Sequence, residues 1–266
     1  MTGEEYITNV DLETGIQYLS PRQVQVETLD KNDPSDFTGY SGAATGADAL
    51  FNNGASKYGI AKFVDYTTQS YDELTPEQKL EVEAAYKQAV KDLGRRELSA
   101  SSKGGKLVRR DYLQAKAGDA VFAISTILNP GQVDKKGYTN RTNKQVVEGG
   151  TGYAVQMAIN LGKPVFVYDQ IKEQWFTWDG SKFSTIETPS LTKKFTGVGS
   201  RSINESGKQA IEDVYEKTFA EENVEAENIT LQQQIEAINI QLELFKENKP
   251  GNKPGTDRTE LNGCNV

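Results

Sequence analysis

The sequence predicts an α/β fold in which a mostly parallel sheet carries helices on both faces. An apolar strand at 119–125 is followed by a glycine-rich turn, a helix ending near Leu161 and a second apolar strand at 163–168. This order is a βαβ unit, whose two strands lie parallel in a covered sheet. Two further junctions of strand, glycine turn and helix occur at 37–57 and 194–219. The predicted architecture is Rossmann-like, and a heptad pattern near the C-terminus adds a coiled-coil-like helix.

The elements before the βαβ unit follow from turn and capping signals. Thr75, Pro76 and Gln78 combine a capping box with a proline at the first helical position, which indicates a helix start. Residues 99–105 are rich in serine and glycine, so we expect a flexible loop there. The sequence thus predicts strands at 37–42 and 60–66 and helices at 43–57, 77–93 and 107–117.

The elements around and after the unit are read in the same way. A long polar insertion at 129–144 precedes the glycine turn, and its length suggests a lid or an interface element. Asp179 and Gly180 stand between alternating aromatic residues, which predicts a hairpin at 174–186. A third strand at 194–202 leads into a helix at 204–219.

Composition excludes several classes of function. The chain of 266 residues has a formal net charge of −8, which argues against a nucleic-acid partner. It contains no histidine, which removes His-dependent triads and zinc sites, and its one cysteine, Cys264, cannot form an internal disulfide. Neither a signal peptide nor a run of about 20 apolar residues is present. We therefore expect a cytoplasmic protein without a membrane partner, cofactor or metal.

The chain divides into four parts by composition. Residues 1–36 form a polar, acidic extension, expected to add an edge strand or to lie over the surface. Residues 37–222 carry the strand, turn and helix junctions. Apolar residues at 223–248 recur at alternating spacings of about four and three, so this helix either pairs with another copy, making a homo-oligomer, or packs back on the domain. Residues 249–266 are rich in Pro, Gly and Asn and are expected to be a flexible tail.

The glycine turn of the βαβ unit is a candidate ligand site. Free backbone N–H groups and the positive end of a helix dipole favour an anion, typically a phosphate. The same glycines could equally serve only the dihedral angles of a tight turn. The candidate residues are Gly149, Gly150, Thr151 and Gly152, with Tyr153 and Gln156 on the helix that follows.

The other two junctions offer similar chemistry. Asp48 either caps its helix or accepts hydrogen bonds from a ligand hydroxyl. Arg110 belongs to a pair of arginines on one helix, a pattern also typical of a solvated face. Because ligands bind at the carboxyl ends of parallel strands, the junctions should meet at one crevice. The further candidates are Ser41, Gly42, Thr45 and Gly46 at the first junction and Gly199, Ser200 and Arg201 at the last.

Three motifs in order resemble the SLOG (SMF/DprA–LOG) superfamily of Rossmann-like nucleotide-binding domains over residues 37–219. YSGAATGAD at 40–48 is similar to the SGGxxGAD turn of the molybdenum-carrier branch and its phage relatives. GGTG at 149–152 is accompanied by GKPV at 162–165, and GVGSR at 197–201 resembles the GSR phosphate turn. The resemblance implies that residues 37–222 are a SLOG-like nucleotide-binding domain.

A sharper comparison is with the lonely-guy phosphoribohydrolases, which cleave the N-glycosidic bond of nucleoside monophosphates. In the register of their GGxGTxxE turn, Tyr153 replaces the threonine and Gln156 the catalytic glutamate, while Arg110 stands in the place of the family's arginine. A neutral amide can neither activate water nor stabilise an oxocarbenium-like centre. The resemblance therefore implies a site that holds a nucleotide without hydrolysing it.

Three functions remain open at this point. The first is non-catalytic sequestration or sensing of a nucleotide-derived signal, such as an ADP-ribose derivative or a cyclic nucleotide, as in a phage anti-defence protein acting in the host cytoplasm. The second is a nucleotide N-glycosidase of the lonely-guy type that uses Glu148 or Asp48 as its carboxylate. The third is a structural or DNA-processing protein on the same scaffold, which the acidic balance disfavours.

Overall fold

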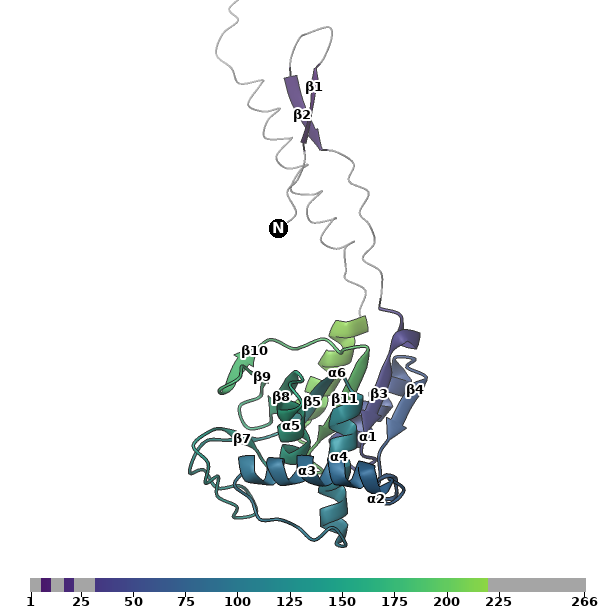
Figure 1. Cartoon of the computed structure of the whole chain (residues 1–266). Coiled ribbons are helices and arrows are strands. Elements are labelled where there is room, and N and C mark those ends of the chain that lie inside the picture. The colour runs from purple at the N-terminus through teal and green to yellow at the C-terminus, as the bar shows by residue number, and fades with distance from the viewer. Residues whose placement is uncertain (1–5, 11–16, 22–31, 220–266) are drawn as a thin grey trace, which may run out of the picture. The chain divides into compact units, whose positions relative to one another are not determined.

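The computed structural model describes residues 6–10, 17–21 and 32–219, and the predicted helix at 223–248 and tail at 249–266 lie outside them. A seven-stranded sheet has the order β10-β9-β8-β5-β11-β3-β4 (Figure 1). Its strands are β3 (Thr38–Ser41), β4 (Lys62–Asp65), β5 (Ala120–Ser125), β8 (Val165–Asp169), β9 (Gln174–Trp178), β10 (Phe183–Ile186) and β11 (Lys194–Gly199). The helices of this domain are α1 (Ala47–Lys57), α2 (Thr68–Asp72), α3 (Pro76–Asp92), α4 (Lys103–Ala117), α5 (Thr151–Asn160) and α6 (Glu205–Phe219), with a 3₁₀ turn, η1 (Pro34–Asp36).

The predicted fold class is confirmed. Strands β8, β5, β11, β3 and β4 are parallel to one another, whereas β9 and β10 add an antiparallel hairpin at the β8 edge. The centre of the sheet therefore has the parallel, mostly buried character that the βαβ unit predicted. The parallel strands present their carboxyl ends along one edge of the sheet, where open α/β sheets hold their ligands.

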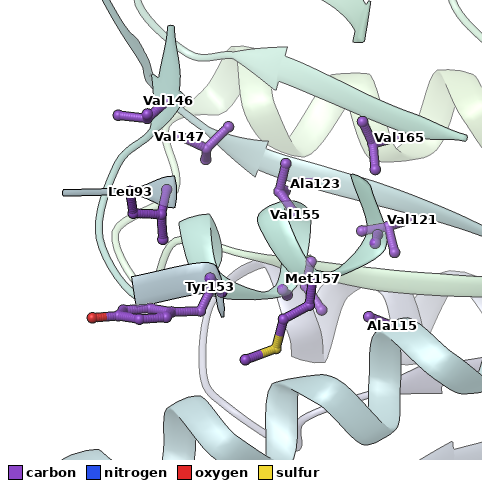
Figure 2. Packing of buried hydrophobic residues seen from close by; sticks show 14 of the residues in the cluster. Leu93, Ala115, Val121, Ala123, Val146, Val147, Tyr153, Val155, Met157 and Val165 are labelled. Atoms are coloured by element: carbon purple, nitrogen blue, oxygen red, sulfur yellow. The ribbon is translucent and has the colours of Figure 1, made fainter. Parts of the chain in front are cut away.

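Helices cover both faces of the sheet, and the residues of β5 alternate between two cores. Val121 and Ala123 belong to a cluster with residues of α3, α4 and α5, as Figure 2 shows for Ala115, Val155 and Met157. The intervening Ala120, Phe122 and Ile124 pack in a second cluster with α1 and α6. Because side chains of a strand point alternately to opposite faces, a strand covered on both sides must be apolar throughout, as 120–124 is.

Local capping sets two helix starts, one as predicted and one not. Thr75 and Gln78 form the capping box of α3, which confirms that prediction. The predicted extent of the flexible loop at 99–105 is wrong, because α4 begins at Lys103 and not at Leu107. The Ser102 hydroxyl accepts a hydrogen bond from the Gly105 N–H (2.9 Å), and this N-cap lets the helix include two glycines.

Two short antiparallel pairs form sheets separate from the seven-stranded one. The N-terminal strands β1 (Tyr6–Val10) and β2 (Gln17–Pro21) pair antiparallel in a sheet of their own, so they add no edge strand to the seven-stranded sheet. The insertion is bounded by β6 (Ile127–Leu128) and β7 (Val146–Val147), which pair antiparallel and close it as a loop. Within the described ranges, no helix combines the length and apolar character that crossing a membrane requires.

Candidate functional site

A pocket of about 520 Å³ lies at the carboxyl ends of β5 and β11, a size within the roughly 300–1,000 Å³ of small-molecule sites. Residues 125 and 126 come directly from the end of β5, and residues 198–202 from the end of β11. The other walls are the pocket side of α4, the glycine turn before α5 and Asp48 in the first turn of α1. The sequence prediction of one crevice at strand ends therefore matches the position of this pocket.

The pocket brings together most, but not all, of the predicted site residues. Those that line it are Asp48, Arg110, Glu148, Gly149, Gly150, Thr151, Tyr153, Gly199, Ser200 and Arg201. Those outside its lining are Ser41, Gly42, Thr45, Gly46, Gly152 and Gln156. The residues at the start of α5 mostly line the pocket, whereas most of the turn before α1 contacts other parts of the protein.

The turn before α5 offers free backbone donors to the pocket. Gly149 has a φ of +65°, a left-handed conformation that a glycine adopts without strain. The N–H groups of Gly149, Gly150 and Thr151 donate to no protein group in the described part of the chain. A Cβ atom at Gly149 or Gly150 would meet nothing within 4 Å, so the space above the turn is open. Successive free N–H groups at a helix N-terminus provide the chemistry of an anion site.

Arg95 holds this turn in place, a role that no sequence motif indicates. Its guanidinium donates to the carbonyl oxygens of Gly149 (2.6 Å) and Val147 (2.9 Å). It also lies 4.8 Å from the ring centre of Tyr153 and 5.1 Å from that of Tyr138. Because the carbonyl groups point toward Arg95, the N–H groups of the same turn remain free to face the pocket.

Tyr153 and Gln156 are engaged within the protein. The Tyr153 ring stacks on Tyr86, with 6.1 Å between ring centres, in addition to its contact with Arg95. Gln156 is 5% exposed, and its amide donates to the Asn160 side chain at 2.8 Å. The position that corresponds to the lonely-guy glutamate therefore lies outside the lining of the pocket.

The turn before α1 is built into the contact with the turn after β11. The Ser41 hydroxyl donates to the Gly197 carbonyl (2.6 Å), and the Ala47 N–H donates to the Ser200 carbonyl (3.1 Å). Gly46 has a φ of +88°, and a Cβ atom there would overlap the Ser200 carbonyl. These residues connect two loops of the crevice, so this motif, which resembles a phosphate-binding turn, serves the packing of the protein.

A buried charged cluster occupies the pocket side of α1 and α4. The Arg110 guanidinium lies 3.2 Å from the Asp111 carboxylate and fits against Gly42, where a Cβ atom would overlap it. The Asp48 carboxylate accepts a hydrogen bond from the Gly199 N–H at 3.0 Å. Arg110, Asp111 and Asp48 are 6%, 8% and 4% exposed, so Arg110 is no part of a solvated face. Its Nε–H group has no partner in the described structure.

Burial shifts the protonation of both carboxylates in this cluster. It raises the pKa of Asp111 to about 7, although Arg110 acts in the opposite direction and Asp48 adds to the rise. Burial also raises the pKa of Asp48, again against the effect of Arg110. Two carboxyl groups thus compete for one guanidinium, and Asp111 can gain or lose its proton near neutral pH.

This cluster predicts that stability depends on pH through Asp111. A carboxyl group with a raised folded pKa binds its proton more tightly when folded, so its contribution to stability is greatest in acid and is lost as the pH rises through about 7. From pH 5 to pH 8, we expect the wild type to lose about 2 kcal/mol more of its unfolding free energy than Asp111→Asn does. Urea unfolding at both pH values measures this, and parallel losses in the two proteins would contradict it.

The exposed rim of the pocket is basic. Lys135 and Lys136 come from the insertion, and Arg201 from the turn after β11. In the described part of the chain, none of these three forms an ion pair. With Arg110 they exceed the three pocket carboxylates Asp48, Asp111 and Glu148 by one charge, although the whole chain carries −8. The pocket is therefore a local place for an anion on an acidic protein.

The predicted site residues omit several lining residues, of which helical spacing would have indicated Gln114. Asp111 follows Arg110 directly, and Gln114 lies four residues after Arg110, hence on the same side of the helix. Ser125 and Thr126 end a predicted strand, where ligand contacts are expected. Lys135 and Lys136 had no local signal beyond their place in a long insertion.

Comparisons with family models, curated proteins and solved structures found no match to this chain. Among residues 6–10, 17–21 and 32–219, no group of three or more His, Cys, Asp or Glu side chains is arranged to hold a metal ion. The chemistry of the pocket is therefore the basis for a proposed function.

Proposed function

We propose that this protein binds a phosphorylated, nucleotide-like small molecule and holds it without hydrolysing it. The observation that carries the proposal is the meeting of two anion-binding features in one pocket. The free N–H groups of residues 149–151 form one, and the buried guanidinium of Arg110, with its unpartnered Nε–H, is the other. The basic rim would attract a ligand whose charge the rest of the surface repels.

The size of the pocket and its apolar parts favour more than an inorganic ion. Leu107, Val108, Ala154 and Val198 line it beside the polar groups, so an organic portion of the ligand has apolar surface to cover. The SLOG resemblance supports a nucleotide-derived signal, such as an ADP-ribose derivative or a cyclic nucleotide. Sequestration or sensing of such a signal, as in a phage anti-defence protein, is the role we propose, with the heptads of 223–248 supporting a homo-oligomer.

The absence of a carboxylate at position 156 supports binding without turnover. Gln156 is neutral, and its amide bonds to Asn160 instead of facing the pocket. A hydrolase remains the second candidate because its predicted carboxylates, Glu148 and Asp48, both line the pocket. The structure adds Asp111 beside them, whose pKa burial raises to about 7. Glycosidases usually cleave their bond with a pair of carboxyl groups, one of which acts as the general acid.

Identification of the released compound separates the two candidates. The full-length protein is mixed with nucleoside monophosphates, cyclic dinucleotides and ADP-ribose isomers, washed and heat-denatured, and the supernatant is examined by mass spectrometry. Recovery of an intact compound near one per site is the expected result. A free base with a ribose phosphate would establish the hydrolase, and recovery of no compound would contradict both candidates.

Substitution of Glu148 by Gln gives a sharper prediction. Glu148 is half-buried at the pocket, and its carboxylate accepts a 3.4 Å hydrogen bond from the Lys135 N–H. If the protein only binds, Glu148→Gln should change the dissociation constant by less than about fivefold, the scale of one weak hydrogen bond. If it hydrolyses its ligand, the same change should abolish product formation at unchanged binding. Gln156→Glu is the control, since a carboxylate outside the pocket should confer no hydrolysis.

A further inference from the structure

Gln114 presents an unexplained polar group at the buried side of the pocket. Its side chain lines the pocket and is 0% exposed, and neither its amide nitrogen nor its amide oxygen has a hydrogen-bond partner in the described structure. Buried side-chain amides are normally paired, because an unpaired donor or acceptor loses its hydration without compensation. An amide with both atoms unpaired therefore indicates a partner that is added later.

The fold itself gives the Gln114 side chain no task. Among the described residues, its side chain makes no hydrogen bond, whereas its backbone carbonyl accepts hydrogen bonds from the Thr196 hydroxyl (2.8 Å) and the Gly118 N–H (3.4 Å). Any residue at this position would provide that carbonyl, and an apolar one would avoid the unpaired amide. The neighbours in the lining, Val108 and Val198, are apolar. The polar side chain is thus better explained by a ligand than by packing.

The chemistry of the amide restricts what that ligand presents. A glutamine amide offers one acceptor and two donors side by side, so it pairs best with a group that carries a donor next to an acceptor. The N6 amino group and N7 of adenine provide this pattern, and Gln is one of the two side chains that pair with them in bidentate fashion. Guanine presents two acceptors, O6 and N7, on the same edge and would leave the glutamine oxygen unpaired.

We propose that Gln114 reads the adenine edge of the ligand and selects adenine over guanine compounds. The proposal rests on the proposed function, since the phosphate would be held by the turn at 149–151 and by Arg110. Arg110 lies one helical turn before Gln114 on the same side of α4, so a single ligand can contact both. In this proposal the cations and the N–H groups of residues 149–151 provide affinity for the phosphate, and Gln114 determines which base is preferred.

The test compares three probes, AMP, GMP and ribose 5-phosphate, by calorimetric titration of the full-length protein. We expect the wild type to bind AMP about tenfold or more tighter than GMP. Gln114→Leu should weaken AMP binding by about tenfold and leave ribose 5-phosphate within twofold, because only the base contact is lost. The ligand-free Gln114→Leu protein should melt at the same temperature as the wild type or higher, since the substitution removes an unpaired buried amide.

A second variant keeps the size of the side chain. Gln114→Glu still accepts from an amino group but cannot donate to N7, so it should also lose AMP affinity while ribose 5-phosphate binding persists. Equal binding of AMP and GMP by the wild type would overturn the reading of the base while leaving phosphate binding in place. A uniform loss for all three probes in Gln114→Leu would also overturn it. Failure of the wild type to bind any of the three probes would overturn the reading of the base, whereas the proposed function fails only if the release experiment recovers no compound.

Discussion

Arg110→Met is expected to lower the affinity for a phosphorylated ligand by about a hundredfold. Arg110 carries the buried positive charge of the pocket, and its Nε–H is free to donate to a ligand oxygen. Loss of charge-assisted hydrogen bonds from a buried guanidinium costs about 1.5–3 kcal/mol or more, and about 2.7 kcal/mol corresponds to a hundredfold in the dissociation constant. Methionine is shorter than arginine but unbranched, so it replaces the aliphatic stem and removes only the guanidinium. Titration with the compound recovered from the wild type measures the effect.

The neighbouring Arg109 provides a matched control with the opposite expected result. Its guanidinium donates twice to the Glu83 carboxylate, at 2.6 and 3.1 Å, and lies 3.9 Å from the ring centre of Tyr86. Arg109→Met should therefore lower the free energy of unfolding by about 2–4 kcal/mol, since it breaks a partly buried ion pair, and should leave affinity near the wild-type value. If Arg109→Met lost the ligand and Arg110→Met kept it, our assignment of the two side chains would be reversed.

These two arginines also show what the sequence alone could not decide. Adjacent positions on a helix point about 100° apart, so one of the pair can face the pocket while the other faces α3. Residue type is identical at both positions, and only the packing of α4 against its neighbours, among them α3, distinguishes them. Sequence reasoning selected Arg110 from its resemblance to a family arginine; the structure adds that Arg109 is bound to Glu83 within the fold.

The central strands could be predicted because a strand that is buried on both faces consists of consecutive apolar residues. Residues 120–124 are apolar at every position, which indicates a strand covered on both faces, and the glycine turns then mark the carboxyl ends. The fate of the individual turn residues was not predictable. In the segment 41–48, the Ser41 hydroxyl and the Ala47 N–H at the start of α1 donate hydrogen bonds to carbonyl groups of β11 and the loop after it. At 149–151, by contrast, the N–H groups have no partner in the described structure. Both turns have the same residue types, and long-range contacts decide between packing and binding.

Arg95→Met is expected to weaken both the fold and the site. Arg95 is half-buried, and its two hydrogen bonds to the carbonyl oxygens of Val147 and Gly149 fix the peptide groups that precede α5. Removing it leaves these carbonyls without their charged donor and removes the cation from the ring of Tyr153. We expect the free energy of unfolding to fall by about 2 kcal/mol, as for a lost pair of hydrogen bonds from a charged group. Urea unfolding of the ligand-free protein measures this loss.

The affinity of the same variant tests whether Arg95 acts as a positioning residue. Arg95 does not line the pocket, so any loss of binding must come through the turn at 149–151. We expect phosphate-bearing ligands to bind about tenfold more weakly, because N–H groups that must first be ordered bind an anion less tightly than groups already in place.

The adjacent Arg96 is exposed, and Arg96→Met should leave both stability and affinity unchanged. Arg95→Lys keeps the charge and the contact with the tyrosine rings but loses the two-pronged hydrogen bonding, so its affinity should fall nearly as far as that of Arg95→Met. Full affinity in the lysine variant would show that charge alone, and not the fixed peptide geometry, is what the turn requires.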